Sequence, residues 1–159
     1  MQVVRRVESS VVGIEVVAEF DRLATAVPAA WRELFSRHTE VPAPAGCRYA
    51  EASRHLGGGR YREVVGVVVA EPVAPPVGMS AVRIPGGDWV HHRHTGPVAE
   101  IGDGFQEIYG WATEQGITLG ERKLDVGYHP DGTEGSHDLY IDVVGHLGSP
   151  RPRLPGRQQ

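Results

Sequence analysis

The sequence predicts an α+β domain in which two similar strand-helix-strand-strand modules form one antiparallel sheet, with both helices on one face. Three observations predict this fold class. Valine-rich segments of strand length outnumber helical segments, only two stretches carry apolar residues at helical spacing, and the order of elements in the first half recurs in the second. A length of 159 residues suits one such domain with a sizeable core.

The elements of the first half follow from local patterns. Residues 1–20 contain two groups of β-branched residues around an interruption at 8–10, and predict one long, kinked strand. A helix is expected to begin between Asp21 and Val27, with Pro28 tolerated only near its first turn. Its apolar stripe consists of Leu23, Val27, Ala30, Trp31, Leu34 and Phe35. Beyond the turn at 41–46, the segments 47–53 and 60–73 are expected to pair as strands around Gly57-Gly58-Gly59.

The second half repeats this order. Residues 78–94 predict a strand that passes through a turn or bulge at Pro85-Gly86-Gly87. A second helical stripe follows and ends near Gly116; it consists of Val98, Ile101, Phe105, Ile108 and Ala112. The segments KLDVGYH and LYIDVV then predict two strands joined by the turn PDGTEG.

These elements set the expected domain limits. We expect one domain at 1–147, with module one at about 1–75 and module two at about 76–147. Residues 148–159 have almost no apolar side chains and predict a disordered tail.

Composition excludes several classes of function. The net charge of −4 provides no basic field for a polyanion, so we expect no direct contact with nucleic acid. One cysteine, Cys47, supports neither a disulfide framework nor a multi-thiolate zinc site, and we interpret it as a small strand residue. The apolar N-terminal stretch is interrupted by charged and polar residues, which favours a cytoplasmic protein without a membrane span.

A metal site is the weaker interpretation of the histidine cluster. His92 and His94, followed by Glu100, are similar to the ligand set of cupin metalloenzymes, and His129 or His137 would be the further ligand. The helix expected after residue 98 stands where a cupin would continue in strands, so we expect no metal and no other cofactor. His94 is instead expected to cap the turn before Gly96.

Two segments resemble a known family. IPGGDWVHHRHTGP at 84–97 and IYGWATEQG at 108–116 are similar to the GyrI-like small-molecule-binding domains, which are related to the effector-binding domains of bacterial multidrug-responsive transcription activators. RYREVVGVVV and DLYIDVV add weaker matches. The resemblance implies a duplicated strand-helix-strand-strand (SHS2) module with the ligand in the cleft between the copies.

The resemblance also implies a polar anchor. A glutamate on the strand after the second helix commonly lies at the floor of the family's pocket, and Asp125 stands at the matching position here. Aspartate is one methylene shorter, and Gly127 replaces the larger residue expected two positions later. On a regular strand, Tyr128 would then point to the opposite face from Asp125.

Aromatic and imidazole side chains complete the expected binding site. Trp89 and His91 share one face of a strand, and an indole stacks well on a planar or cationic ligand. Tyr140 in the last strand and Tyr49 in the first module are further candidates. Four other aromatic residues lie on or beside the helical stripes and are expected in the core: Trp31, Phe35, Phe105 and Trp111.

Together these features predict a stand-alone protein that sequesters or senses hydrophobic or cationic aromatic compounds, without room for an N-terminal DNA-binding domain. The alternative is a hydrolase of strained electrophiles such as cyclopropane-bearing natural products. In that case Asp125 would be the general acid or base, assisted by Tyr140 or His91. A third interpretation is a module whose cleft docks a protein or peptide. The oligomeric state stays open.

Overall fold

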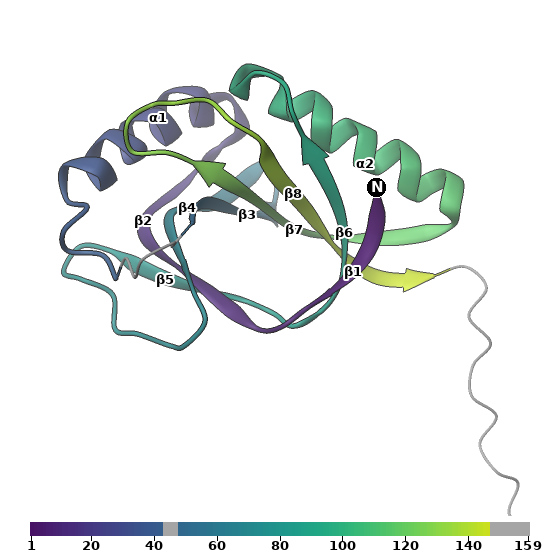
Figure 1. Ribbon diagram of the computed structural model, residues 1–159, viewed down its shortest axis with the longest axis horizontal. Coiled ribbons are helices and arrows are strands. Elements are labelled where there is room, and N and C mark those ends of the chain that lie inside the picture. Colours follow the sequence, from purple (N-terminus) through teal and green to yellow (C-terminus); the bar gives the residue numbers. More distant parts are fainter. Residues whose placement is uncertain (43–47, 147–159) are drawn as a thin grey trace, which may run out of the picture.

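The computed structural model describes residues 1–42 and 48–146, and it contains two α-helices, a short 3-10 helix and eight strands (Figure 1). In the first half the elements are β1 (Gln2–Arg6), β2 (Ser9–Glu19), α1 (Phe20–Ser36), β3 (Tyr49–Gly57) and β4 (Arg60–Val69). In the second half they are β5 (Ser80–Ile84), β6 (Gly87–His94), η1 (Val98–Glu100), α2 (Ile101–Gln115), β7 (Ile117–Tyr128) and β8 (His137–His146).

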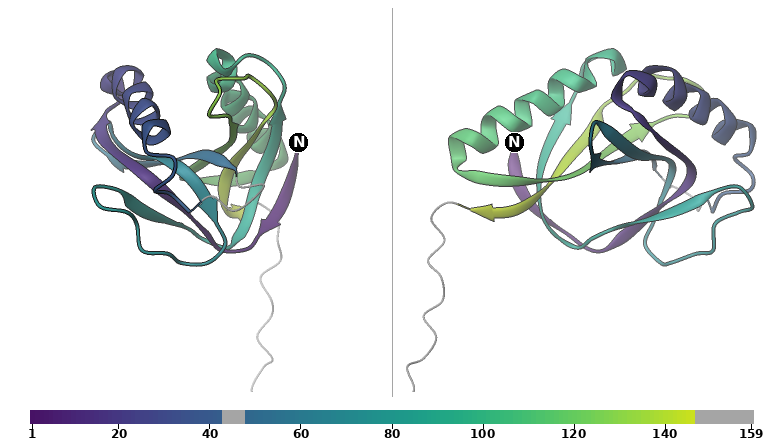
Figure 2. Two further views of the ribbon diagram at one scale, coloured as in Figure 1. Left: turned by 60° about the vertical axis from the view of Figure 1, so that its left-hand side comes forward. Right: turned by 180° about the vertical axis from the view of Figure 1, so that it is seen from behind.

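All eight strands form one antiparallel sheet in the order β1-β6-β8-β7-β3-β4-β2-β5. The order is symmetric about the β7–β3 pair, because each strand of one module has its counterpart at the same distance from the centre. The α+β class and the two related modules are therefore confirmed. Both helices lie on the same side of the sheet and are separated from each other, as the left view of Figure 2 shows.

A bent two-stranded ribbon connects the two ends of the sheet. β1 pairs with β6, and after only Val7 and Glu8 the chain continues as β2, which pairs with β5. In the other strand of the ribbon, Pro85 and Gly86 form the bend between β5 and β6. The expected long, kinked strand is thus two strands in different parts of the sheet. If the chain is divided near residue 75, β1 belongs to the first half but pairs with β6 of the second half. In the same way, β5 belongs to the second half but pairs with β2 of the first half.

The core lies on both faces of the sheet. On the helical face, α1 packs on β2 and β4 while α2 packs on β6, β7 and β8. On the opposite face, the ribbon packs against the central strands. The buried residues of this second layer are Val11, Ala50, Ala52, Val64, Ile84, Trp89, Leu124 and Val126.

The helix positions differ from expectation in one respect. α1 begins directly after β2, and the Phe20 N–H donates to the Gly59 carbonyl at 3.1 Å, so the hairpin satisfies the first helical N–H. Pro28 therefore lies inside the helix and not in its first turn, which was the expectation. Proline cannot donate to the carbonyl four residues earlier. The end of α2 is as predicted: Gly116 has φ 67° and closes the helix in the left-handed conformation.

Two expectations concern residues outside the described ones, namely Cys47 as a strand residue and the tail at 148–159. Among the helices of residues 1–42 and 48–146, none is long and apolar enough to cross a membrane.

Two glycines make the close approach of β2 and β4 possible. Gly13 and Gly66 are direct partners in the ladder. A Cβ built on Gly13 would stand 1.9 Å from the Val65 carbonyl oxygen, and one built on Gly66 would stand 2.0 Å from the Val12 carbonyl oxygen. Because these neighbours are backbone atoms, no side-chain rotation relieves the contact. Glycine inside a strand is typical of such a close approach of two backbones.

Gly13→Ala is expected to lower the free energy of unfolding by about 1–3 kcal/mol or more, because the backbone must shift to admit the methyl group. Chemical denaturation measures the change. Gly102→Ala is the control, since a Cβ there has no neighbour within 4 Å and alanine favours the exposed helix by about 0.5–1 kcal/mol. Equal stability of Gly13→Ala and wild type would contradict the assigned register.

Candidate functional site

Two carboxyl groups meet at the centre of the helical face. Glu51 on β3 is the direct ladder partner of Asp125 on β7, and these two strands are the symmetric centre of the sheet. Directly opposed side chains in an antiparallel ladder have Cβ atoms about 4.5–5.5 Å apart. The two modules therefore contribute one acidic residue each to the same point, in the space between the helices.

A bulge in β7 brings a tyrosine to the same point. The β3–β7 register shifts between Tyr49 and Ala50, so that Tyr128 is opposite Tyr49 while Val126 is opposite Ala50. Gly127 is the extra residue and adopts φ 146°, a conformation that other residues rarely adopt. The expectation that Tyr128 points away from Asp125 is therefore wrong, because the bulge reverses the alternation of side chains. The Tyr128 hydroxyl donates to Asp125 Oδ2 at 2.6 Å.

The other oxygen of Asp125 is also occupied. His137 Nδ1 donates to Asp125 Oδ1 at 2.6 Å, and both residues are almost fully buried. The imidazole lies edge-on to the Tyr128 ring, with 4.7 Å between the ring centroids. Asp125 thus accepts one hydrogen bond on each oxygen, which fixes its orientation.

Aromatic rings from α1 cover the pair of carboxyls. Trp31 Nε1 donates to Glu51 Oε1 at 2.5 Å, and the indole lies 4.5 Å from the Tyr128 ring. Phe35 stacks on Trp31 at 5.1 Å, and Tyr49 packs edge-on against Phe35 at 5.3 Å. The space above the carboxyls is therefore filled by the protein's own rings.

Burial changes the protonation of this site. Burial and the nearby charges of Glu63 and Asp125 raise the pKa of Glu51 to about 8, although hydrogen bonds from Trp31 and Tyr128 oppose the rise. Burial also raises the pKa of Glu63 on β4, against the hydrogen bond from Ser53 and the charge of Lys123. At neutral pH the Glu51 carboxyl is therefore mostly protonated.

A basic and aromatic group from the second module borders the site. Lys123 on β7 places its ammonium 5.3 Å from the ring centroids of both Phe105 and Tyr109 on α2. Such geometry allows a cation–π interaction. This edge of the interhelical space is thus lined by α2, whereas the opposite edge is lined by α1.

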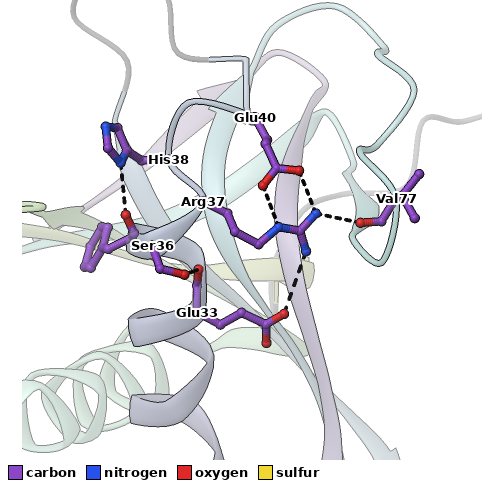
Figure 3. Close-up of polar contacts among 7 residues, drawn as sticks. Glu33, Ser36, Arg37, His38, Glu40 and Val77 are labelled. Carbon is purple, nitrogen blue, oxygen red and sulfur yellow. Dashed lines mark hydrogen bonds and ion pairs between the residues drawn. The ribbon is translucent and has the colours of Figure 1, made fainter.

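The end of α1 is fixed to the β4–β5 connection, and Figure 3 shows the contacts. Arg37 donates to both carboxylate oxygens of Glu40 at 2.7 and 2.9 Å, and to the Val77 carbonyl at 2.7 Å. The hydrogen bonds that Arg37 donates hold the pKa of Glu40 below its ordinary value. This anchor restrains the helix that carries Trp31.

The residues expected to form one binding site lie on two faces of the sheet. Asp125 and Tyr49 are on the helical face. Trp89, His91 and Tyr140 are on the opposite face, because β6 and β8 direct Val90 and Leu139 toward α2 and the alternate residues away from it. Trp89 is 2% exposed and donates from Nε1 to the Pro85 carbonyl at 3.3 Å. His91 and Tyr140 therefore cannot assist a reaction at Asp125.

Sequence reasoning missed the participation of Glu51, Trp31 and Tyr128. Glu51 could have been found by aligning the two modules, since it occupies in β3 the place of Asp125 in β7. Trp31 was expected only in the core, and it does pack there, but its N–H also reaches a carboxyl group. The bulge at Gly127 gives no signal beyond the glycine itself.

The histidines considered for a metal make other contacts. His92 Nε2 pairs with Glu107 at 2.8 Å. His94, the last residue of β6, donates from Nε2 to the Pro97 carbonyl at 3.0 Å and so closes the turn before η1. Within the part of the chain that the structure describes, no group of three or more histidine, cysteine, aspartate or glutamate side chains has the arrangement of a metal site.

Comparison with known proteins identifies the family. The chain belongs to the family of GyrI-like small molecule binding domains, whose sequence model matches residues 2–144. No curated protein sequence matches the chain significantly.

Solved structures share the fold at low sequence identity. SAV2435 bound to tetraphenylphosphonium is 12% identical, with 91% of this chain and 93% of that chain covered at a TM-score of 0.71. An integron cassette protein from the mobile metagenome of Vibrio cholerae is 9% identical over 89% and 94% of the two chains, with a TM-score of 0.67. A hydrolase from Listeria innocua is 13% identical over 89% and 90%, with a TM-score of 0.55.

The raised pKa of Glu51 predicts how stability depends on pH. The folded state holds a proton that the unfolded state releases above its ordinary pKa of 4.5, so this stabilisation is complete below about pH 4.5 and is lost as pH rises through about 8. We expect Glu51→Gln to gain stability relative to wild type by more than about 1 kcal/mol between pH 5 and 8. Urea denaturation across this range measures it.

Glu114→Gln on the exposed surface of α2 is the matched control and is expected to show no such trend. A pH-independent difference between Glu51→Gln and wild type would show that Glu51 is ionised in the folded protein at neutral pH.

Proposed function

We propose that this protein binds hydrophobic cations with aromatic groups in the space between α1 and α2, and thereby sequesters or senses them. The observation that carries the proposal is the pair Glu51 and Asp125, held side by side under aromatic rings where the two modules meet. A buried carboxylate is costly unless it is paired. A bulky cation without hydrogen-bond donors provides the positive charge that pairs with the carboxylate, and it leaves the existing hydrogen bonds of Asp125 intact.

Aromatic side chains supply the remaining affinity. The faces of indole and phenol rings attract cations, and the attraction is stronger in a site from which water is excluded. Trp31 and Tyr128 carry such rings and already contact the two carboxyl groups. Because these rings fill the space, we propose that a ligand enters by separating the Trp31 and Tyr128 rings, which requires a small displacement of α1. SAV2435, which shares the fold, is bound to tetraphenylphosphonium, a cation of this kind.

Tetraphenylphosphonium tests the proposal directly. We expect saturable binding by calorimetry, quenching of tryptophan fluorescence, and a loss of affinity of about tenfold or more in Asp125→Asn and in Glu51→Gln. Asp103→Asn and Glu114→Gln are matched controls on the exposed face of α2. The neutral relative triphenylphosphine oxide should bind much more weakly, since it lacks the charge. Equal affinities in all four variants would place the ligand elsewhere.

Affinity for the cation is expected to rise with pH. With a pKa of about 8, the ionised fraction of Glu51 rises from about one tenth at pH 7 to about nine tenths at pH 9. Binding at pH 7 should therefore release a proton, which calorimetry in buffers of different ionisation enthalpy detects. Glu51→Gln should remove both effects. Proton uptake on binding would contradict the assigned role of Glu51.

The protonated carboxyl of Glu51 also supports a second candidate, hydrolysis of a strained electrophile. In this reaction Glu51 protonates a carbonyl conjugated to a cyclopropane, water attacks a ring carbon as the carbon–carbon bond opens, and Asp125 accepts the proton of the water. The hydrolase from Listeria innocua shares the fold.

The two candidates have opposite pH profiles. Turnover of a cyclopropane-bearing compound, followed by product mass, should fall above about pH 8 as Glu51 loses its proton, whereas cation binding should strengthen. Hydrolysis is supported if Glu51→Gln abolishes product formation, and it is refuted if wild type yields no product above the uncatalysed rate.

A further inference from the structure

A cavity lies on the face of the sheet opposite the helices. It has a volume of about 1080 Å³ and is bordered by the bend of the ribbon, the end of β4 and the central strands β7 and β8. Its lining includes Val4, Arg6, Ser9, Val68, Val126 and Tyr140. This volume exceeds the range of about 300–1000 Å³ that is common for small-molecule sites. Neither Glu51 nor Asp125 contributes to it.

Two residues that line this cavity each carry a buried polar atom without a hydrogen-bond partner among the described residues. The atoms are Arg6 Nε and the hydroxyl oxygen of Ser9, a residue that is 9% exposed. An unsatisfied buried donor costs about 1–3 kcal/mol. The two residues flank the bend at Val7 and Glu8, so one segment of chain brings both side chains to the wall of the cavity.

Arg6 is a cation without a carboxylate partner among the described residues. Its guanidinium lies 4.2 Å from the centroid of the Tyr140 ring, and Tyr140 in turn stacks on His91 at 4.8 Å. The other charged side chains of the cavity are Arg5, Glu8, Arg48 and Glu71.

Three of these four neighbours are already in ion pairs. Arg5 pairs with Asp88 at 3.4 Å, Glu8 pairs with Arg83, and Arg48 pairs with Asp138. Asp138 also accepts from His91 Nε2 at 2.8 Å. Burial by itself raises the pKa of Asp138, but its hydrogen bonds with Arg48 and His91 outweigh burial and lower it. The fourth, Glu71, is exposed and forms no ion pair with Arg6, so the positive charge of Arg6 stays available within the cavity.

The apolar residues of the cavity wall indicate that the remainder of the ligand is hydrophobic. Val4, Val68 and Val126 line the cavity next to the Tyr140 ring and form an apolar surface. A guanidinium recognises a carboxylate or sulfonate through two parallel hydrogen bonds, one of them from Nε.

We propose that this cavity is a binding site for organic anions, namely aromatic carboxylates or sulfonates. The anionic group binds the guanidinium of Arg6 and the hydroxyl of Ser9, and the apolar body lies against the valines. The domain then has two sites of opposite charge preference on the two faces of one sheet.

A pair of fluorescent probes tests the charge preference. They are 8-anilinonaphthalene-1-sulfonate and N-phenyl-1-naphthylamine, which has the same aromatic body without the sulfonate. We expect Arg6→Gln to weaken sulfonate binding by about 10- to 100-fold and to change binding of the neutral probe little. Arg60→Gln, at the exposed start of β4, is the matched control and should leave both affinities unchanged. An unchanged affinity of Arg6→Gln for the sulfonate would overturn the proposal.

Wild-type protein provides a measurement that does not depend on the folding of a variant. The Nε–Hε resonance of Arg6, assigned by correlation along its own side chain, should shift on titration with the sulfonate. Saturating tetraphenylphosphonium should leave this shift and the sulfonate affinity in place, because the two sites are on different faces. A resonance that does not move at saturation, or displacement of the sulfonate by the cation, would overturn the assignment of a separate anion site.

Discussion

At the middle of the sheet, β3 and β7 run antiparallel and bring one residue of each module face to face. This pairing is the constraint on which the site depends. It places two acidic side chains where both would be ionised in water, in a space that the helices and their aromatic residues close off. The high pKa of Glu51 follows from burial and from that placement, whereas the two hydrogen bonds on Asp125 come from Tyr128 and His137 of the second module. The site is a property of the interface between modules, and neither module contains it alone.

The sequence predicted the fold class well because element order and hydrophobic spacing are local signals. The valine-rich strands, the two helical stripes and the stop at Gly116 all depend on neighbours a few residues apart. The sequence did not predict that β1 and β2 are two strands in different parts of the sheet. The Glu-Ser-Ser interruption suits a kink within one strand as well as a bend between two strands. The prediction that Pro28 lies near the first turn was wrong for a related reason. α1 begins directly after β2 without a side-chain cap, so no capping residue in the sequence marks its start.

The candidate site was predicted in part. The position of Asp125 on a strand came from the family resemblance, but which residues share its face depends on register. A bulge of one residue at Gly127 turned Tyr128 toward Asp125, and the pairing of β6 with β8 turned His91 and Tyr140 away from it. Register depends on contacts between residues far apart in the chain, and a sequence reveals alternation along a strand more readily than the partner of that strand.

The bent ribbon determines which strand edges stay unpaired while the chain is being synthesised. During synthesis the chain emerges from its N-terminus, so β1 and β2 appear long before their partners β6 and β5. The valine-rich strand β2 can pair with β4 once residue 69 has emerged, but its other edge stays open until β5 follows. Open strand edges promote association between chains. The charged residues Arg5, Arg6 and Glu8 at the end of β1 and in the bend lie where they discourage such contacts during that interval.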